Sequence, residues 1–337
     1  MNLVRVPKLR TSVVLPGAAN NSWRERLATL AIALILDLAF GEPPARLHPV
    51  VGIGRIVSFL ERRAPPSSPR GALVYGGGLT IATIAMAVGA SALLERIVAR
   101  LPLLPRLFVG AVLLKPVFAV RELVQATRQV RRLIEVGDVV SARHAVRSLV
   151  SRDPTELDTP LIAAAAIESI AENASDSVVA PCLAFLTTGL PCAYAYRAAN
   201  TLDAMIGYHG RYEFLGKVAA RLDDGLNLIP ARLTAHLLIV GAALGGADWR
   251  RALLTAWREH CKTASPNAGW PMSAMAGALG VQLEKIGHYR LGAPLRPVAA
   301  QDIALAERIV IRGIGAGFAG LVAIAVLSRG KNQGGEP

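Results

Sequence analysis

The chain has 337 residues, of which 53% are hydrophobic and 18% are charged. An average soluble domain is about 25% charged, so this composition favours an integral membrane protein and excludes a disordered, collagen-like or disulfide-framework protein. Lysine and arginine number 37 against 24 acidic residues, a formal net charge of +13, which fits a polyanionic partner or an anionic membrane face. The three cysteines form no Cys-x-x-Cys pair and are expected to be buried apolar side chains.

Two apolar segments are long enough to cross the hydrocarbon core of a bilayer, which takes about 20 helical residues. They cover residues 72–94 and 178–196, and neither contains a charged residue. Shorter apolar runs lie at 27–40, 107–114, 233–247 and 313–327. The sequence therefore predicts an all-α, polytopic membrane bundle with about four to six membrane helices. A Gly-Leu-Pro break at 189–191 leaves a helical hairpin as the alternative for the second segment.

Basic residues flank the first apolar run and also fill the segment 121–152. Both regions can be cytoplasmic only if an even number of crossings separates them, so one of the first three apolar runs is predicted not to span. The amphipathic pattern of 117–149 indicates a solvated helical hairpin or a surface resting on anionic lipid. We expect a flexible basic extension at 1–26, one membrane-embedded domain at 27–328 and a disordered tail at 329–337.

The polar residues that interrupt this apolar chain are its candidate functional residues, because an ionisable group at the centre of a membrane helix costs about 2.5–3.5 kcal/mol. Glu168, Glu172 and Asp176 are spaced four residues apart, so they lie along one face of a helix. Carboxylate oxygens in such a row suit Mg²⁺, which keeps several waters and bridges to substrate phosphates. The alternative is a solvated acidic face.

A second cluster, Arg197, Asn200 and Asp203, lies within two helical turns. These groups can hold a phosphate oxygen and a metal ion together, or they can form a helix-end capping network.

A third cluster contains Arg221, Asp223, Asp224, Asn227 and Arg232. Two adjacent carboxylates with an amide one turn later form a second plausible site for a metal or an amine, and Arg232 at the start of an apolar helix can hold an anion. A single aspartate cap would explain one of these carboxylates but not both.

A fourth cluster is the block Ser265-Pro-Asn-Ala-Gly-Trp-Pro271, with Asn267 and Trp270 as its polar and aromatic members. Its prolines, asparagine and glycine predict a tight loop whose backbone N–H groups and indole face can hold a flat or anionic ligand. An ordinary turn is the alternative.

One dinucleotide-binding pattern is misleading. Gly315, Gly317 and Gly320 fit G-x-G-x-x-G, but no strand precedes them. Gly313 and Gly317 instead form the small-x-x-x-small pattern that predicts close packing of membrane helices. A Walker phosphate loop is absent from the sequence.

With these clusters in place, the sequence resembles the adenosylcobinamide-phosphate synthases, the CobD/CbiB family of cobalamin biosynthesis, from about residue 30 to 327. The matching segments follow the family order and lie at 36–55, 168–176, 200–203, 220–234 and 265–271. The first of them contains Asp37, Glu42 and the His48-Pro-Val motif. The chain departs from the family pattern at Arg197, where a lysine is usual.

The resemblance implies an ATP-dependent amide ligase that joins adenosylcobyric acid to (R)-1-amino-2-propanol or its O-phosphate. It implies Mg²⁺ as cofactor, ATP as co-substrate, and a multi-pass protein of the bacterial inner membrane with a cytoplasmic active site. The lipid bilayer and other enzymes of cobalamin biosynthesis are the expected partners, and no nucleic acid is expected.

On this basis we predict catalytic roles for Glu168, Glu172, Asp223, Asp224, Arg232 and His48. Metal ligands are predicted at Glu172, Asp176, Asp223 and Asp224. Substrate or phosphate binding is predicted for Asn173, Arg197, Asn200, Asp203, Arg221, Asn227, Ser265, Asn267 and Trp270.

Two other functional classes fit the same polar clusters. A transporter or corrinoid-handling membrane protein would distribute them along a translocation path. A structural scaffold for a biosynthetic complex would not need the 265–271 block or the paired aspartates.

Overall fold

The computed structural model describes residues 23–46, 48–65, 68–150, 153–208 and 210–330, most of which are helical. The first half contains α1 (Trp23–Phe40), α2 (Pro49–Glu61), α3 (Pro69–Val98), α4 (Leu103–Leu114), the 3₁₀ turn η1 (Lys115–Val117), α5 (Val120–Glu135) and α6 (Val139–Val146). The second half contains α7 (Thr159–Ala174), the π-helical turn η2 (Ser175–Val179), α8 (Ala180–Thr188), α9 (Leu190–Ile206), α10 (Lys217–Leu226), α11 (Leu228–Gly245), α12 (Trp249–Glu259), the 3₁₀ turn η3 (His260–Lys262), α13 (Gly269–Leu279) and α14 (Ala300–Gly330).

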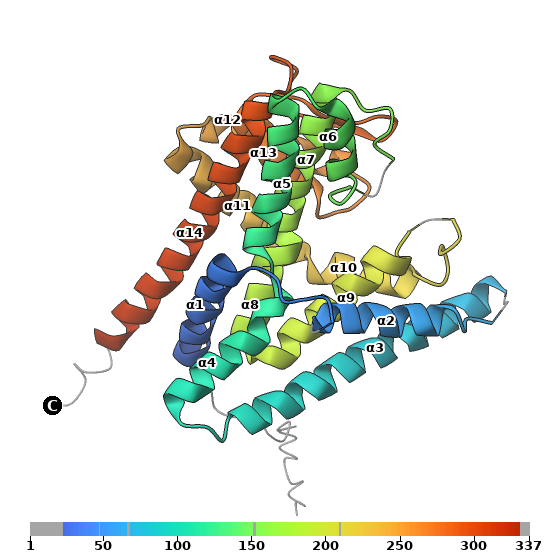
Figure 1. Cartoon of the computed structure of the whole chain (residues 1–337), viewed down its shortest axis with the longest axis vertical. Helices are drawn as coiled ribbons and strands as arrows, with labels where there is room; N and C mark the ends of the chain where they lie inside the picture. The colour runs from blue at the N-terminus through green and yellow to red at the C-terminus, as the bar shows by residue number, and fades with distance from the viewer. Residues whose placement is uncertain (1–22, 47, 66–67, 151–152, 209, 331–337) are drawn as a thin grey trace, which may run out of the picture.

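The helices form two groups. In Figure 1, α5, α7 and α13 stand in the upper part of the molecule and α14 runs from there to the lower left, while α2, α3, α9 and α10 run across the right side. The centre of the first group is α7, in which every residue from 162 to 171 is buried. Five of those ten residues are alanines, so neighbouring helices can approach it closely. A smaller core joins α2, α3, α9 and α10 around Val57, Leu79 and Leu202.

Four helical segments in the described part of the chain are long and apolar enough to cross a membrane. They are Pro69–Val98, Leu103–Glu135, Leu228–Gly245 and Ala300–Ser328. The second consists of α4, η1 and α5. The prediction of an all-α polytopic membrane protein is confirmed, with four segments at the lower end of the predicted number.

The prediction of one continuous span over 178–196 is wrong, and the alternative of two helices is correct. The chain breaks at Gly189, whose φ of +98° lies in the region that glycine reaches without strain. Helix α8 ends there and α9 begins at Leu190, and the two helices pack on each other. The carboxylate of Glu95 accepts a hydrogen bond from the backbone N–H of Leu190 at 3.1 Å, which ties this break to α3.

The amphipathic segment 117–149 forms α5 and α6, joined by a turn with Gly137 at φ +77°. The predicted helical hairpin is confirmed. Its apolar face rests on α7 and α14.

One short β-hairpin was not predicted. Strand β1 (Leu283–Lys285) pairs antiparallel with β2 (Tyr289–Leu291), and Lys285 lies opposite Tyr289. The predicted basic extension at 1–26 lies outside the described residues as far as residue 22, and the predicted tail at 329–337 lies outside them from residue 331.

Helices α11 and α14 cross at glycines, as the small-x-x-x-small pattern predicts. A Cβ at Gly313 would overlap the carbonyl oxygen of Leu237, and a Cβ at Gly317 would lie 2.9 Å from Cδ2 of the same leucine. On the facing helix, a Cβ at Gly241 would overlap the carbonyl oxygen of Ile309. The two backbones therefore meet at a distance that only glycine permits.

We expect Gly313→Ala to lower the free energy of unfolding by about 1–3 kcal/mol, because the added methyl group must push α11 and α14 apart. Thermal unfolding in detergent measures the loss. Gly320→Ala in the same helix is the matched control, since a Cβ there meets no atom within 4 Å. Equal stability of the two variants would contradict the packing described here.

Candidate functional site

The candidate site lies at a π-helical turn within the continuous helical segment formed by α7, η2 and α8. Helix α7 continues through the π-helical turn η2 into α8, and η2 carries Ser175 and Asp176. A π-turn inside an α-helix accommodates one extra residue and is frequent at functional sites. Glu172 lies on the last turn of α7 beside it. The predicted stripe of acidic residues is thus present on this segment, and its last member lies on the turn where the helix changes geometry.

Two adjoining pockets open beside η2, and they share a wall formed by Glu172, Asp176 and Asp203. The first, which we call the carboxylate pocket, has a volume of about 240 Å³. Its remaining carboxylates are Asp223 and Asp224 from α10. Its neutral polar groups are Ser175, Asn227, Ser265 and Asn267.

The second, which we call the hairpin pocket, has a volume of about 510 Å³. Beyond the shared wall, α7 and α9 line it with predicted site residues, namely Glu168, Asn173 and Asn200. On its other side the β-hairpin supplies Lys285 and Tyr289.

A chain of hydrogen bonds holds Asp223 in the carboxylate pocket. Asn227 donates from Nδ2 to Asp223 Oδ2 at 2.9 Å, and Asn200 donates from Nδ2 to Asp223 Oδ1 at 3.3 Å. The hydroxyl of Tyr196 donates to Asn227 Oδ1 at 2.9 Å, and Arg197 donates to Asn200 Oδ1 at 3.4 Å. Neutral amides thus contact both oxygens of this carboxylate and fix its orientation.

The loop 265–268 closes the carboxylate pocket from the opposite side. The hydroxyl of Ser265 accepts hydrogen bonds from the backbone N–H groups of Asn267 and Ala268, at 3.2 and 3.3 Å. Asn267 donates to the backbone oxygen of Asp224 at 2.7 Å, and Arg232 donates to Asn267 Oδ1 at 3.2 Å. The predicted tight loop is therefore present, and its Asn267 forms hydrogen bonds with both α10 and α11.

Trp270 lies behind this loop. Its ring stacks on His260 with centroids 3.9 Å apart, and the Arg232 guanidinium lies 5.1 Å from its centroid. These contacts hold Arg232 at the margin of the pocket with its planar face on an aromatic ring.

Burial and mutual repulsion raise the pKa of the pocket carboxyl groups. Burial raises the pKa of Asp176 well above its ordinary value, and Glu172 and Asp223 raise it further. Burial also raises the pKa of Glu172, against the attraction of Lys285, and raises that of Asp223, against its hydrogen bonds to amides. For Asp203, burial followed by repulsion from neighbouring carboxylates raises the pKa to about 7.

This donor set suits a hard divalent cation that keeps part of its hydration shell. Five carboxyl groups face a small pocket. Lys285 attracts Glu172, Arg221 attracts Asp224 and Arg197 interacts with Asp176, yet burial keeps the pKa values of all three carboxyl groups raised. Among the described residues, no three His, Cys, Asp or Glu side chains already lie close enough to form a complete metal cage. Mg²⁺ needs only one or two protein carboxylates when waters and phosphates supply its other ligands.

The predicted arginines do not line either pocket. Arg197 is half-buried beside Asn200, and desolvation lowers its pKa, while Tyr196, Glu42 and Asp176 act in the opposite direction. Arg221 pairs with Asp224 at 3.5 Å and is largely exposed. Arg232 and Trp270 lie behind the 265–268 loop, so these four residues surround the carboxylate pocket without entering it.

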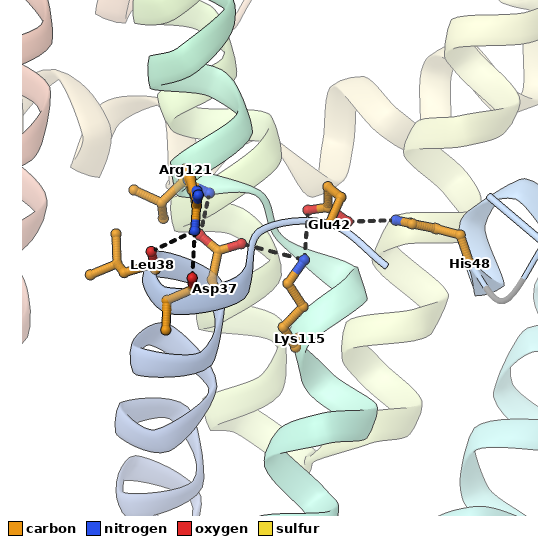
Figure 2. A network of polar contacts seen from close by, with 8 residues as sticks. Asp37, Leu38, Glu42, His48, Lys115 and Arg121 are labelled. Atoms are coloured by element: carbon orange, nitrogen blue, oxygen red, sulfur yellow. Dashed lines mark hydrogen bonds and ion pairs between the residues drawn. The ribbon is translucent and has the colours of Figure 1, made fainter. Parts of the chain in front are cut away.

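His48 lies in a separate polar network, which Figure 2 shows. Its Nε2 lies 2.7 Å from Glu42 Oε2, and its Nδ1 accepts from the backbone N–H of Val50 at the start of α2. Lys115 Nζ lies 3.0 Å from Glu42 and 3.6 Å from the buried Asp37. Asp37 in turn accepts hydrogen bonds from the first backbone N–H groups of α5. His48 lines neither pocket, and its predicted catalytic role stays a prediction.

Sequence reasoning missed Ser175, Lys285, Tyr289 and the buried Tyr196. A signal for the hairpin was present, because Gly287 lies between two short segments that contain aliphatic and aromatic residues. Nothing in the sequence indicated that this hairpin faces Glu172.

We expect the metal-free protein to lose stability as the pH rises from about 5 to 8, by about 2 kcal/mol. The pKa of Asp203 is raised from its ordinary value of 3.8 to about 7, so the folded state binds a proton that the unfolded state releases. The stabilisation from this extra proton is fully present below pH 3.8, the ordinary pKa, and it is lost as the pH rises through about 7, the pKa in the folded state. Thermal unfolding in the presence of a chelator, over a series of pH values, measures it.

Asp203→Asn should flatten this pH dependence. Asp138→Asn is the control, because the exposed Asp138 caps α6 and hydrogen bonding to Ser141 lowers its pKa. An unchanged pH slope in Asp203→Asn would show that Asp203 titrates near its ordinary value.

Comparison with known proteins identifies one family. The family model described as CobD/Cbib protein matches residues 30–312. The chain is 43% identical over 279 residues to the cobalamin biosynthesis protein CobD of Dehalococcoides mccartyi (strain CBDB1), a match that covers 83% of this chain and 91% of that protein. It is 44% identical over 311 residues to the cobalamin biosynthesis protein CobD of Chromobacterium violaceum, covering 88% and 96%. No solved structure matches the chain significantly.

Proposed function

Since the chain belongs to the CobD/CbiB family of cobalamin biosynthesis, we propose that it is the ATP-dependent ligase that joins adenosylcobyric acid to (R)-1-amino-2-propanol or its O-phosphate. We place it in the bacterial inner membrane, with the two pockets facing the cytoplasm, where ATP is available. The observation that carries the proposal is the carboxylate pocket, in which Glu172, Asp176, Asp203, Asp223 and Asp224 converge from three separate helical segments.

The reaction requires activation of a carboxylate, because direct attack by an amine would have to expel oxide. We propose that the substrate carboxylate oxygen takes the γ-phosphoryl group of ATP, which gives an acyl phosphate and ADP. The amine nitrogen then attacks the carbonyl carbon, the C–N bond forms, and the bond from carbon to the phosphate oxygen breaks. The products are the amide and inorganic phosphate, and the amine transfers its proton to a base.

Mg²⁺ bound at the carboxylate pocket would neutralise charge on the transferring phosphoryl group. Its protein ligands would come from Glu172, Asp176, Asp223 and Asp224, of which Mg²⁺ needs only one or two. The orientation of Asp223 is already fixed by Asn200 and Asn227, so this ligand does not have to be ordered when the cation binds.

The remaining groups suit the anionic parts of the substrates. Arg232 presents a planar guanidinium beside Asn267 and can bind a phosphate through two N–H groups. Arg197 lies near Asn200 and can offset charge at the shared wall of the two pockets. Asp203, with a pKa of about 7, has the basicity required to accept the proton of the attacking amine near neutral pH.

The direct test combines purified protein with adenosylcobyric acid, ATP, Mg²⁺ and aminopropanol, with or without its phosphate, and detects the amide by mass. Formation of the amide together with ADP and phosphate supports the ligase. Corrinoid flux into vesicles without ATP cleavage would favour the transporter class instead.

We expect Asp223→Asn and Glu172→Gln each to lower the rate of amide formation at least about 100-fold, because each removes a charged ligand of the proposed cation. The variants should still fold, since amides occupy the same volume. Glu122→Gln is the control, because Glu122 is exposed on α5 and lines neither pocket. Turnover at the wild-type rate by either variant would remove that residue from the metal site.

Arg232→Lys should raise the KM for aminopropanol phosphate several-fold and change the KM for free aminopropanol little. Lysine keeps the charge but replaces a planar two-point donor with a single ammonium group. Steady-state kinetics with both amines provides the measurement. If both amines respond equally, Arg232 does not bind the phosphate of the amine substrate.

A further inference from the structure

A groove bounded by α1, α5 and α14 lies apart from the candidate site. Its volume of about 550 Å³ is in the range of pockets that bind small ligands. Two of its walls are apolar, with Leu34, Ile35 and Leu38 from α1 and Ile311, Ile314 and Phe318 from α14. Part of the space between these helices is open because Ala31 and Gly315, which line it, fill little of it.

The third wall of the groove, on α5, contains two valines and all the polar side chains that line the groove. Arg121, Gln125 and Arg128 lie on one face of α5, because residues at i, i+4 and i+7 project on the same side of a helix. Arg121 donates from Nη1 to the backbone oxygens of Leu38 and Ala39, at 3.0 and 2.6 Å. Arg128 donates from Nε to Glu307 at 3.2 Å. The other guanidinium N–H groups of both arginines make no hydrogen bond to any described residue, so they are free to bind an anion.

The groove straddles the level at which α14 changes from charged to apolar. Asp302, Glu307, Arg308 and Arg312 lie in the first half of α14, and no charged residue occurs from Gly313 to Ser328. The groove includes Ile311 above this boundary and Phe318 below it. In a membrane protein such a boundary marks the level of the lipid headgroups.

Helix α1 runs beside the same apolar half of α14 in the opposite direction. Arg24 near the start of α1 donates to the Ser328 hydroxyl near the end of α14 at 3.0 Å, while the end of α1 meets α5 at Arg121. With 18 residues at about 1.5 Å each, α1 is about 27 Å long, close to the thickness of the hydrocarbon core. The apolar space between α1 and α14 continues toward the end of α14. Two further pockets between these helices share Phe318 with the groove.

From these features we propose that the groove binds one anionic phospholipid. Its phosphate contacts Arg121 and Arg128, and an acyl chain runs down between α1 and α14. An amphiphile with a negative head and an apolar tail matches the polar wall, the apolar walls and the position at the headgroup level. The bound lipid would fill space that the side chains of α1 and α14 leave open.

Native mass spectrometry of the full chain, delipidated in detergent and titrated with phosphatidylglycerol or phosphatidylcholine of identical chains, tests the headgroup. We expect one phosphatidylglycerol to bind about fivefold or more tightly than phosphatidylcholine, since each nearby arginine contributes to anionic lipid binding. Equal affinity for the two lipids would overturn the proposal.

The acyl chain is tested by filling the groove. Gly315 lines the groove and a Cβ there meets no atom within 4 Å, so the side chain of Gly315→Leu starts in open space within the groove. We expect this variant to lose the high-affinity lipid. Gly320→Leu is the matched control, because Gly320 also has open space around its Cβ position but does not line the groove. If Gly315→Leu binds phosphatidylglycerol as tightly as Gly320→Leu does, the groove is not the site.

The phosphate contact is tested by Arg128→Gln combined with Glu307→Gln, which leaves no buried carboxylate without a cationic partner. We expect the preference for phosphatidylglycerol over phosphatidylcholine to fall several-fold while thermal unfolding stays close to that of the wild type. Arg131→Gln is the control, since Arg131 pairs with Glu135 on the same helix and lines no part of the groove. An unchanged preference in the double variant would exclude Arg128 from the headgroup site.

Discussion

The organisation of the candidate site depends on holding several carboxyl groups together in one small pocket. Repulsion and burial both act against this arrangement, as the raised pKa values of Asp176, Asp203 and Asp223 show. The chain counters it with neutral donors, because Asn200, Asn227 and Tyr196 fix the geometry without neutralising the charge. A pocket neutralised by arginines would be more stable by itself but would have less affinity for a cation. The three predicted arginines accordingly lie around the pocket and line neither cavity.

The helices that carry the site meet through small residues. Alanines around Glu168 in α7 admit close neighbours on every side, and Gly241 and Gly313 bring the backbones of α11 and α14 into contact. A polar site at the edge of a membrane protein requires rigid walls, since water or lipid would otherwise enter. Backbone-to-backbone packing supplies this rigidity without large side chains.

Much of this site was predictable because it depends on local spacing. The four-residue spacing of Glu168, Glu172 and Asp176 places them on one helical rod, and the paired aspartates of α10 signal a cluster without further information. We expected these acidic segments to lie together in one site, because isolated acidic groups in an apolar chain are energetically costly. The contributions of Lys285 and Tyr289 were not predictable, because a three-residue strand has no preference for a particular neighbour. Similarly, the Gly-Leu-Pro sequence at 189–191 indicated a break in the helix. Only the structure shows that the carboxylate of Glu95 on α3 accepts a hydrogen bond from Leu190, the first residue after Gly189.

The network of Figure 2 explains why residues near the N-terminus accompany a pocket built mainly by the second half of the chain. Asp37 fixes the start of α5, and through Lys115 it is linked to Glu42, whose negative charge acts on Arg197. Arg197 in turn donates to Asn200, which holds Asp223. At its other end the network reaches Arg121, which lines the lipid groove. Ion pairs and hydrogen bonds, with one longer-range electrostatic step from Glu42 to Arg197, therefore link the groove to the carboxylate pocket. Lys115 and Asp37 are almost fully buried, so the series persists only while α1, η1 and α5 keep their present packing.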